Sequence, residues 1–210
     1  MSIAQRPTAF GRTEDLLPAV SGGPSVRNGT ALGIDIVGPT GDQRIDGLLT
    51  SVAWDGERLN YSAPDHRSDY GTPYHEPLDT LTPLSAGQLQ TLHFALNTTT
   101  YNPGGVQSGT FSVEAFAAVG ITYTAGGSAG AVMRYANSKA PTTAYAFYPD
   151  EDDPRAGDAF FGGAGRQPVQ GNYDYLTILH EAGHTLGAST PTTAPPTARF
   201  PPPGTRWSTR

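Results

Sequence analysis

The segment from residue 173 to residue 187 is the part of this sequence that most restricts the fold. Its large apolar residues recur at helical spacing, and a helix with such a stripe has to be covered on one side by the rest of the chain; they are Leu176, Ile178, Leu179 and Leu186. Asn172 is a suitable N-cap and Gly187 a suitable end. We therefore expect a long amphipathic helix that packs against a layer built from earlier residues.

This helix carries the pattern H-E-x-x-H, formed by His180, Glu181 and His184. Residues four apart lie on the same helix face, so His180 and His184 can direct two imidazoles at one metal ion. Glu181 lies beside that position, where a carboxylate can accept a proton from water. The pattern indicates zinc peptidase chemistry; the alternative is a chance spacing of polar residues on a solvated or partly buried helix face.

The residues around the motif resemble the active-site helix of the serralysins, which are bacterial zinc metalloproteases of the metzincin group. The similarity covers residues 171–175 before the motif and 185–187 after it. In that group the motif continues as H-E-x-x-H-x-x-G-x-x-H. Gly187 stands at the position of the glycine, and Thr190 stands at the position of the third histidine. The resemblance implies Glu181 as general base and His180 and His184 as zinc ligands.

Thr190 leaves two functions open. A threonine hydroxyl is a poor zinc ligand, catalytic zinc usually has three protein ligands, and residues 188–210 contain no His, Asp, Glu or Cys. The first function is a zinc-dependent metalloendopeptidase that hydrolyses peptide bonds of proteins, although this chain could be inactive without the third histidine. The second is a non-catalytic remnant or peptide-binding module of the same fold.

The resemblance, which spans about residues 45–187, implies an α+β fold like the upper catalytic subdomain of a metzincin. This fold has a twisted, mixed but mostly parallel β-sheet, a backing helix and the active-site helix. The segment 85–96 has helical spacing and an N-cap at Ser85, so it is the expected backing helix. A short helical segment is expected within 111–118. Strands are expected at 59–62, 121–124, 131–136, 144–148 and near 157–163.

The segment Ala144, Tyr145, Ala146 and Phe147 is the expected substrate-binding strand. It ends before Pro149, as an edge strand can. In the metzincin fold such a strand borders the cleft, and its unpaired backbone groups can bind a peptide as an additional strand. The expected partner is therefore a protein or peptide substrate.

Three regions are expected along the chain. Residues 1–44 form a largely irregular N-terminal extension with one candidate strand in 31–37, residues 45–187 form the catalytic domain, and residues 188–210 form a disordered tail rich in Pro and Thr. The lower subdomain and the calcium-binding β-roll of the family are missing. The resemblance therefore predicts a truncated or frame-shifted chain, and its abrupt end at Gly187 favours the frame shift.

Composition excludes several other classes. The chain has 210 residues, a net charge of −6 and no cysteine. We see no basic stripe for nucleic acid, no apolar run of membrane-spanning length and no N-terminal signal peptide. The family resemblance implies a secreted, extracellular protein with zinc as its cofactor, and we expect a monomer.

Other polar residues have simpler interpretations. His93 is expected to be a half-buried residue of the backing helix, and His66 and His75 are expected on the surface. The acidic residues 150–153 and Asp158 lack the spacing of a calcium-binding loop. A solvated acidic loop is therefore favoured over a calcium site, although calcium remains possible in the family.

Overall fold

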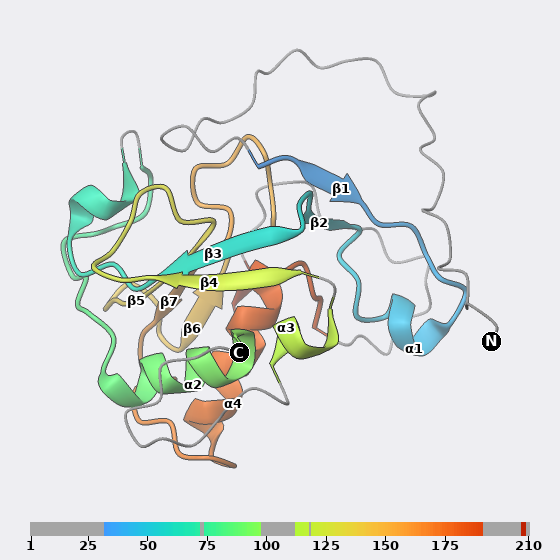
Figure 1. The fold of residues 1–210 in the computed structure, drawn as a ribbon. Coiled ribbons are helices and arrows are strands. Elements are labelled where there is room, and N and C mark those ends of the chain that lie inside the picture. The colour runs from blue at the N-terminus through green and yellow to red at the C-terminus, as the bar shows by residue number, and fades with distance from the viewer. Residues whose placement is uncertain (1–31, 72–73, 98–111, 118, 191–206, 209–210) are drawn as a thin grey trace, which may run out of the picture.

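A computed structural model describes residues 32–71, 74–97, 112–117, 119–190 and 207–208, and its main element is one mixed sheet (Figure 1). The strand order is β4-β3-β5-β7-β6-β8. The first four run parallel, while β6 is antiparallel to both β7 and β8. The bounds are β3 (Arg58–Ser62), β4 (Gly120–Thr124), β5 (Met133–Asn137), β6 (Ala144–Ala146), β7 (Asp158–Phe161) and β8 (Trp207–Ser208). The predicted α+β class with a mostly parallel sheet is confirmed.

Two helices cover one face of this sheet (Figure 1). They are α2 (Ala86–Leu96) and α4 (Tyr173–Thr185), which also contact each other, and the short α3 (Val113–Phe116) lies against α2. Ser85 caps α2 as predicted, in a reciprocal pair of hydrogen bonds with Gln88. The core between helices and sheet includes Tyr61, Leu92, Leu96, Tyr135, Phe161 and Ile178.

A long connection covers the opposite face of the sheet. It contains the 3₁₀ helix η1 (Arg67–Tyr70), and its apolar residues pack on Ala136, Tyr145, Phe147 and Phe160. Neighbouring residues of one strand therefore point into different cores, as Tyr135 and Ala136 do. Burial on both faces explains why these strands lack the alternation of polar and apolar residues that a half-exposed sheet shows.

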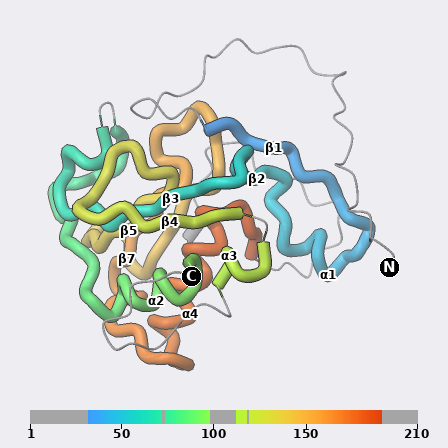
Figure 2. Tube along the Cα trace, in the orientation of Figure 1, coloured from blue at the N-terminus to red at the C-terminus, as the bar shows by residue number. Residues whose placement is uncertain are grey.

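Residues 34–54 form a small second sheet. Strand β1 (Ile34–Ile36) pairs antiparallel with β2 (Val52–Trp54), and the one-turn helix α1 (Gln43–Asp46) lies between them in the chain (Figure 2). The strand predicted within 31–37 is therefore present. The domain boundary predicted at residue 45 falls inside α1, so residues from 34 onward belong to the folded body. Residues 1–31 lie outside the described part.

The C-terminal tail is only partly described. Its residues Trp207 and Ser208 form β8, which pairs with Ala146 and Tyr145 of β6, so this pair is not disordered as predicted. Residues 191–206 and 209–210 lie outside the described part. Among the described helices, none is long and apolar enough to cross a membrane.

The buried face of α4 differs from the predicted stripe. Leu176 is 59% exposed and Leu179 is only half-buried, whereas the buried positions include Thr177, Ile178, Glu181, Ala182 and Thr185. Small and polar residues occupy this face because α4 lies close to α2 and the sheet, where hydrogen bonds satisfy several of them. Hydrophobicity alone therefore predicted the helix but not its orientation.

Candidate metal centre

Helix α4 is fixed at both ends. Asn172 caps it by accepting a hydrogen bond from a first-turn amide at 2.8 Å, and the Asp174 carboxylate accepts two from the preceding loop at 2.9 Å each. Near its other end the Thr185 hydroxyl lies 2.6 Å from the Tyr135 hydroxyl, and Trp54 Nε1 donates to the Thr185 carbonyl at 2.8 Å. These contacts hold the motif residues of α4 in a fixed position above the sheet.

His180 and His184 point at the same place, as predicted from their spacing. Their Nε2 atoms lie 3.0 Å apart. His184 Nδ1 lies 2.8 Å from the Ala188 carbonyl, which can only accept, so we assign the proton to Nδ1 and the free lone pair to Nε2. Burial lowers the pKa of both imidazoles. The pKa of His184 falls to about 4. Both are therefore in the neutral form that metal ions bind.

Glu181 lies on the buried side of the motif. Its side chain is 1% exposed, and neither carboxylate oxygen has a hydrogen-bond partner among the described residues. Burial raises its pKa to about 8. Buried polar groups without partners are rare and often have a functional reason. A buried carboxyl group on the same helix as two converging imidazole nitrogens is the residue set of a hydrolytic metal centre.

Two further side chains lie beside the histidines. Thr190 Oγ1 lies 3.5 Å from Nε2 of His180 and 3.5 Å from Nε2 of His184. The ring of Tyr148 packs edge-on against His184, with centroids 5.2 Å apart. The sequence pattern identified Thr190 only as a missing histidine, and no sequence signal pointed to Tyr148.

The remaining histidines lie outside the motif, as predicted, although His93 is fully buried rather than half-buried. His93 is buried in α2, where its Nδ1 lies 2.5 Å from the Tyr61 hydroxyl, and His66 caps η1 at the surface. His75 is exposed. In the described part of the chain, no three His, Cys, Asp or Glu side chains converge on one point. Any third protein ligand among the described residues is therefore of another type.

The expected substrate strand is β6 followed by Phe147. Its side chains point into the two cores, with Ala144, Tyr145, Ala146 and Phe147 each at most 1% exposed. The strand is not the open edge that the sequence predicted, because β8 is paired to its outer side. A peptide could therefore pair with β6 only after β8 has moved away.

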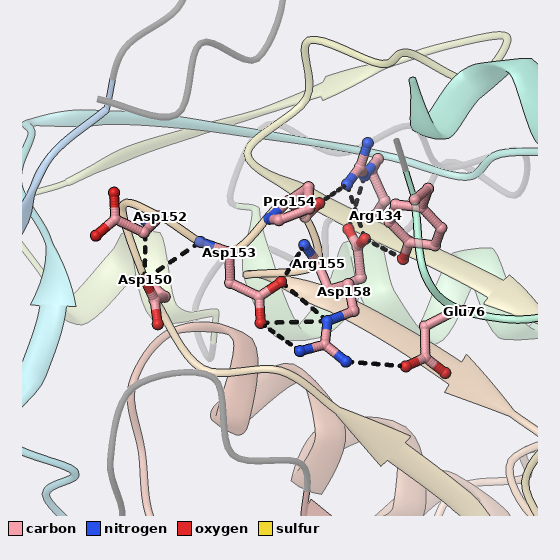
Figure 3. A network of polar contacts seen from close by, with 9 residues as sticks. Glu76, Arg134, Asp150, Asp152, Asp153, Pro154, Arg155 and Asp158 are labelled. Atoms are coloured by element: carbon pink, nitrogen blue, oxygen red, sulfur yellow. Dashed lines mark hydrogen bonds and ion pairs between the residues drawn. The ribbon is translucent and has the colours of Figure 1, made fainter. Parts of the chain in front are cut away.

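The acidic segment after β6 contributes to a buried ion network rather than to a purely solvated loop (Figure 3). Asp158 forms a two-pronged ion pair with Arg134 at 2.7 Å, and both side chains are at most 1% exposed. Asp153 binds Arg155, which also reaches Glu76. Of the acidic residues, Glu151 and Asp152 are exposed, as predicted for a solvated loop. The sequence did not predict these pairs, although a charged Arg134 inside an apolar strand was a signal that it needs a partner.

The buried Glu181 gives a prediction for pH dependence in the metal-free protein. The folded state holds this proton up to about pH 8, whereas the unfolded chain releases it near 4.5. At this residue the folded state therefore binds more protons in this window, so Glu181 makes stability fall as pH rises. The histidines with lowered pKa act in the opposite direction in both proteins, so the comparison is with Glu181→Gln: relative to that variant, the wild type should lose roughly 1–2 kcal/mol of unfolding free energy between pH 6.5 and 8, measured by urea denaturation with a chelator present. Identical pH slopes in the two proteins would contradict the assignment.

Comparisons with known proteins do not assign the chain. No protein-family model matches it, and no curated protein matches it significantly. The basis for a function is therefore the geometry of α4 and of the groups around it.

Proposed function

We propose that this protein is a zinc-dependent metalloendopeptidase similar to the serralysins, which hydrolyses peptide bonds of proteins. The observation that carries the proposal is the convergence of the His180 and His184 Nε2 atoms, 3.0 Å apart, on a helix that also carries the buried Glu181, whose carboxyl group has no hydrogen-bond partner among the described residues. Two neutral imidazoles and a carboxyl group that can accept a proton are the groups that hydrolysis at a zinc ion requires.

Each motif residue has a separate task. His180 and His184 would hold a zinc ion, which when bound supplies Lewis-acid activation of water and of the scissile carbonyl group. Glu181 accepts the proton of the attacking water and passes it to the leaving amine. In the metal-free protein burial keeps Glu181 protonated near neutral pH. Positive charge beside it favours its carboxylate form, which is the form that acts as a base.

The fold supports the same proposal. A mostly parallel sheet with a backing helix and a helix that carries the motif is the arrangement that the family resemblance implied, and α2 and α4 take these two places. With it we propose the remaining properties that follow from that resemblance: a protein or peptide substrate, an extracellular location and a monomeric state. The net charge of −6 gives no reason to propose nucleic acid as a partner. Calcium has no part in the proposal, because the carboxylates of Asp153 and Asp158 already pair with arginines.

Removal of the last four residues tests the substrate strand. These residues contain β8, whose pairing with Tyr145 and Ala146 occupies the outer side of β6. A peptide that pairs with β6 has to displace β8, and each hydrogen bond between the two strands contributes about 1 kcal/mol. Without β8 this cost disappears. We therefore expect deletion of residues 207–210 to lower the KM for a peptide substrate by about threefold to tenfold, in a steady-state assay. Deletion of residues 209–210 alone is the control and should change nothing; equal effects of both deletions would argue against peptide binding on β6.

The activity itself is tested with casein. We expect the chain to cleave casein when loaded with zinc and to stop when a chelator removes the metal. The second candidate function, a non-catalytic peptide-binding module, is favoured by one observation, which is Thr190 at the place of the third histidine. Peptide binding without cleavage, in protein shown to contain zinc, would select that second function and reject the first.

A further inference from the structure

We propose that the Thr190 hydroxyl group is the third protein ligand of the metal, in a site made of two imidazoles and one alcohol. This inference rests on the proposed function, because it concerns the same metal. It arises from an unexpected placement: the residue that replaces the third histidine in the sequence lies beside both Nε2 atoms.

The distances among the three atoms fit a shared metal ion. Thr190 Oγ1 lies 3.5 Å from each Nε2, and the two Nε2 atoms lie 3.0 Å apart. Ligands about 2.0–2.1 Å from a zinc ion at tetrahedral angles are about 3.3–3.4 Å from one another. The three atoms form a triangle, and the point equidistant from them is about 1.9 Å from each. This distance is close to the usual zinc–ligand distance of about 2.0–2.1 Å, so one ion could contact all three atoms. At 3.5 Å the contacts of Thr190 are too long for strong hydrogen bonds.

The chain holds Thr190 in this position through the turn that ends α4. Gly187 has φ +98°, and a Cβ there would lie 2.3 Å from the Val52 carbonyl oxygen, so only glycine fits. The segment 48–50 anchors this turn. The Thr50 hydroxyl donates to the Gly187 carbonyl at 2.7 Å, and the Ser189 amide donates to the Leu48 carbonyl at 2.7 Å.

The turn is also tied to the histidines themselves. His184 Nδ1 binds the Ala188 carbonyl, and the ring of Tyr148 packs edge-on against the His184 ring. The carbonyl group that orients His184 therefore lies two residues before Thr190 in the chain. This coupling places the alcohol oxygen and the imidazoles together before any metal binds, which lowers the ordering cost of binding.

The chemistry of the third ligand sets the expected affinity. A neutral hydroxyl is a weaker donor to zinc than an imidazole, yet it fills a position that would otherwise hold water. Thr190 is exposed and His180 is half-buried, so one side of the site stays open to solvent and substrate. We expect zinc affinity to lie between that of a two-histidine site and that of a three-histidine site, with the ion exchanging readily.

The test is a zinc titration of four proteins against a chromophoric chelator: the full wild-type chain, Thr190→Val, Thr190→Ser and Thr190→His. Valine keeps the shape and removes the oxygen, whereas serine keeps the oxygen. Loss of a group that supports a metal site typically costs about 10–100-fold in affinity. We expect Thr190→Val to bind zinc at least about tenfold more weakly, Thr190→Ser to match the wild type within about threefold, and Thr190→His to bind about 10–100-fold more tightly.

Absorption spectra of the Co(II)-loaded proteins give a second readout that does not depend on activity. The d–d bands should change in Thr190→Val and stay unchanged in Thr190→Ser, because the ligand set changes only in the former. Equal zinc affinities and equal spectra for the wild type and Thr190→Val would show that Thr190 is not a metal ligand. They would not contradict zinc binding by His180 and His184. Absence of zinc binding in all four proteins would overturn the proposed function, and this inference with it.

Discussion

Replacement of Glu181 with glutamine is expected to abolish peptide hydrolysis while zinc binding persists. Glutamine keeps the shape of the side chain but cannot accept the proton of the attacking water. General base catalysis contributes about 10²–10⁴-fold, so kcat/KM for a fluorogenic casein substrate should fall by at least about 100-fold. Zinc affinity should change little, because the converging nitrogens belong to His180 and His184 and the carboxyl group of Glu181 is not one of these ligands.

The stability of this variant separates a catalytic role from a structural one. Glu181 has no hydrogen-bond partner among the described residues, so its replacement breaks no bond that holds the fold. We expect Glu181→Gln to melt at the same temperature as the wild type or higher. The exposed Glu151 supplies the control, because Glu151→Gln should alter neither activity nor stability. An unaltered rate in Glu181→Gln would exclude this residue as the base.

Replacement of Asp158 with asparagine is expected to have the largest effect on stability. It leaves the Arg134 charge buried and without its ion-pair partner, in a position where the guanidinium group also contacts the Pro154 carbonyl and the ring of Tyr70. Removal of one partner of a buried ion pair costs about 3–5 kcal/mol. Since domains are stable by only about 5–15 kcal/mol, urea denaturation should show a loss of about a fifth or more of the unfolding free energy.

Two variants test whether the unpaired charge is the cause. Asp153→Asn breaks the partly exposed pair with Arg155 and should cost about 1 kcal/mol or less. The double variant Arg134→Met with Asp158→Leu removes both charges and should recover part of the stability lost in Asp158→Asn. If Asp158→Asn were no more harmful than Asp153→Asn, the buried pair would not stabilise the fold as we describe.

The elements that the sequence predicted correctly are those with local signals. Helix α2 follows from a capping serine and apolar residues at helical spacing, and α4 from its own cap and the motif spacing. The convergence of His180 and His184 also needed only the geometry of one helix. Local rules were sufficient because each of these features depends on residues fewer than about 15 positions apart, roughly four helical turns.

The features that the sequence did not reveal depend on distant contacts. The position of Thr190 follows from the segment 48–50, which lies more than a hundred residues earlier in the chain: the Thr50 hydroxyl and the Gly187 carbonyl are 137 positions apart. The ion pair of Arg134 with Asp158 joins two different strands, and β8 pairs with the distant β6. No local sequence pattern relates the paired segments. Likewise, the orientation of α4 is set by its packing on α2 and the sheet. Periodicity cannot predict such contacts, because it describes one element at a time.

The most direct test of the metal centre is a zinc titration of the metal-free chain, followed by metal analysis after gel filtration. We predict one zinc ion per chain in the wild type, and an affinity at least about 100-fold weaker in His184→Gln, which removes one of two imidazoles. His75→Gln is the matched control, since His75 is exposed and should not affect binding. Absence of zinc in the wild type, or equal affinity in the wild type and His184→Gln, would contradict the metal centre on α4.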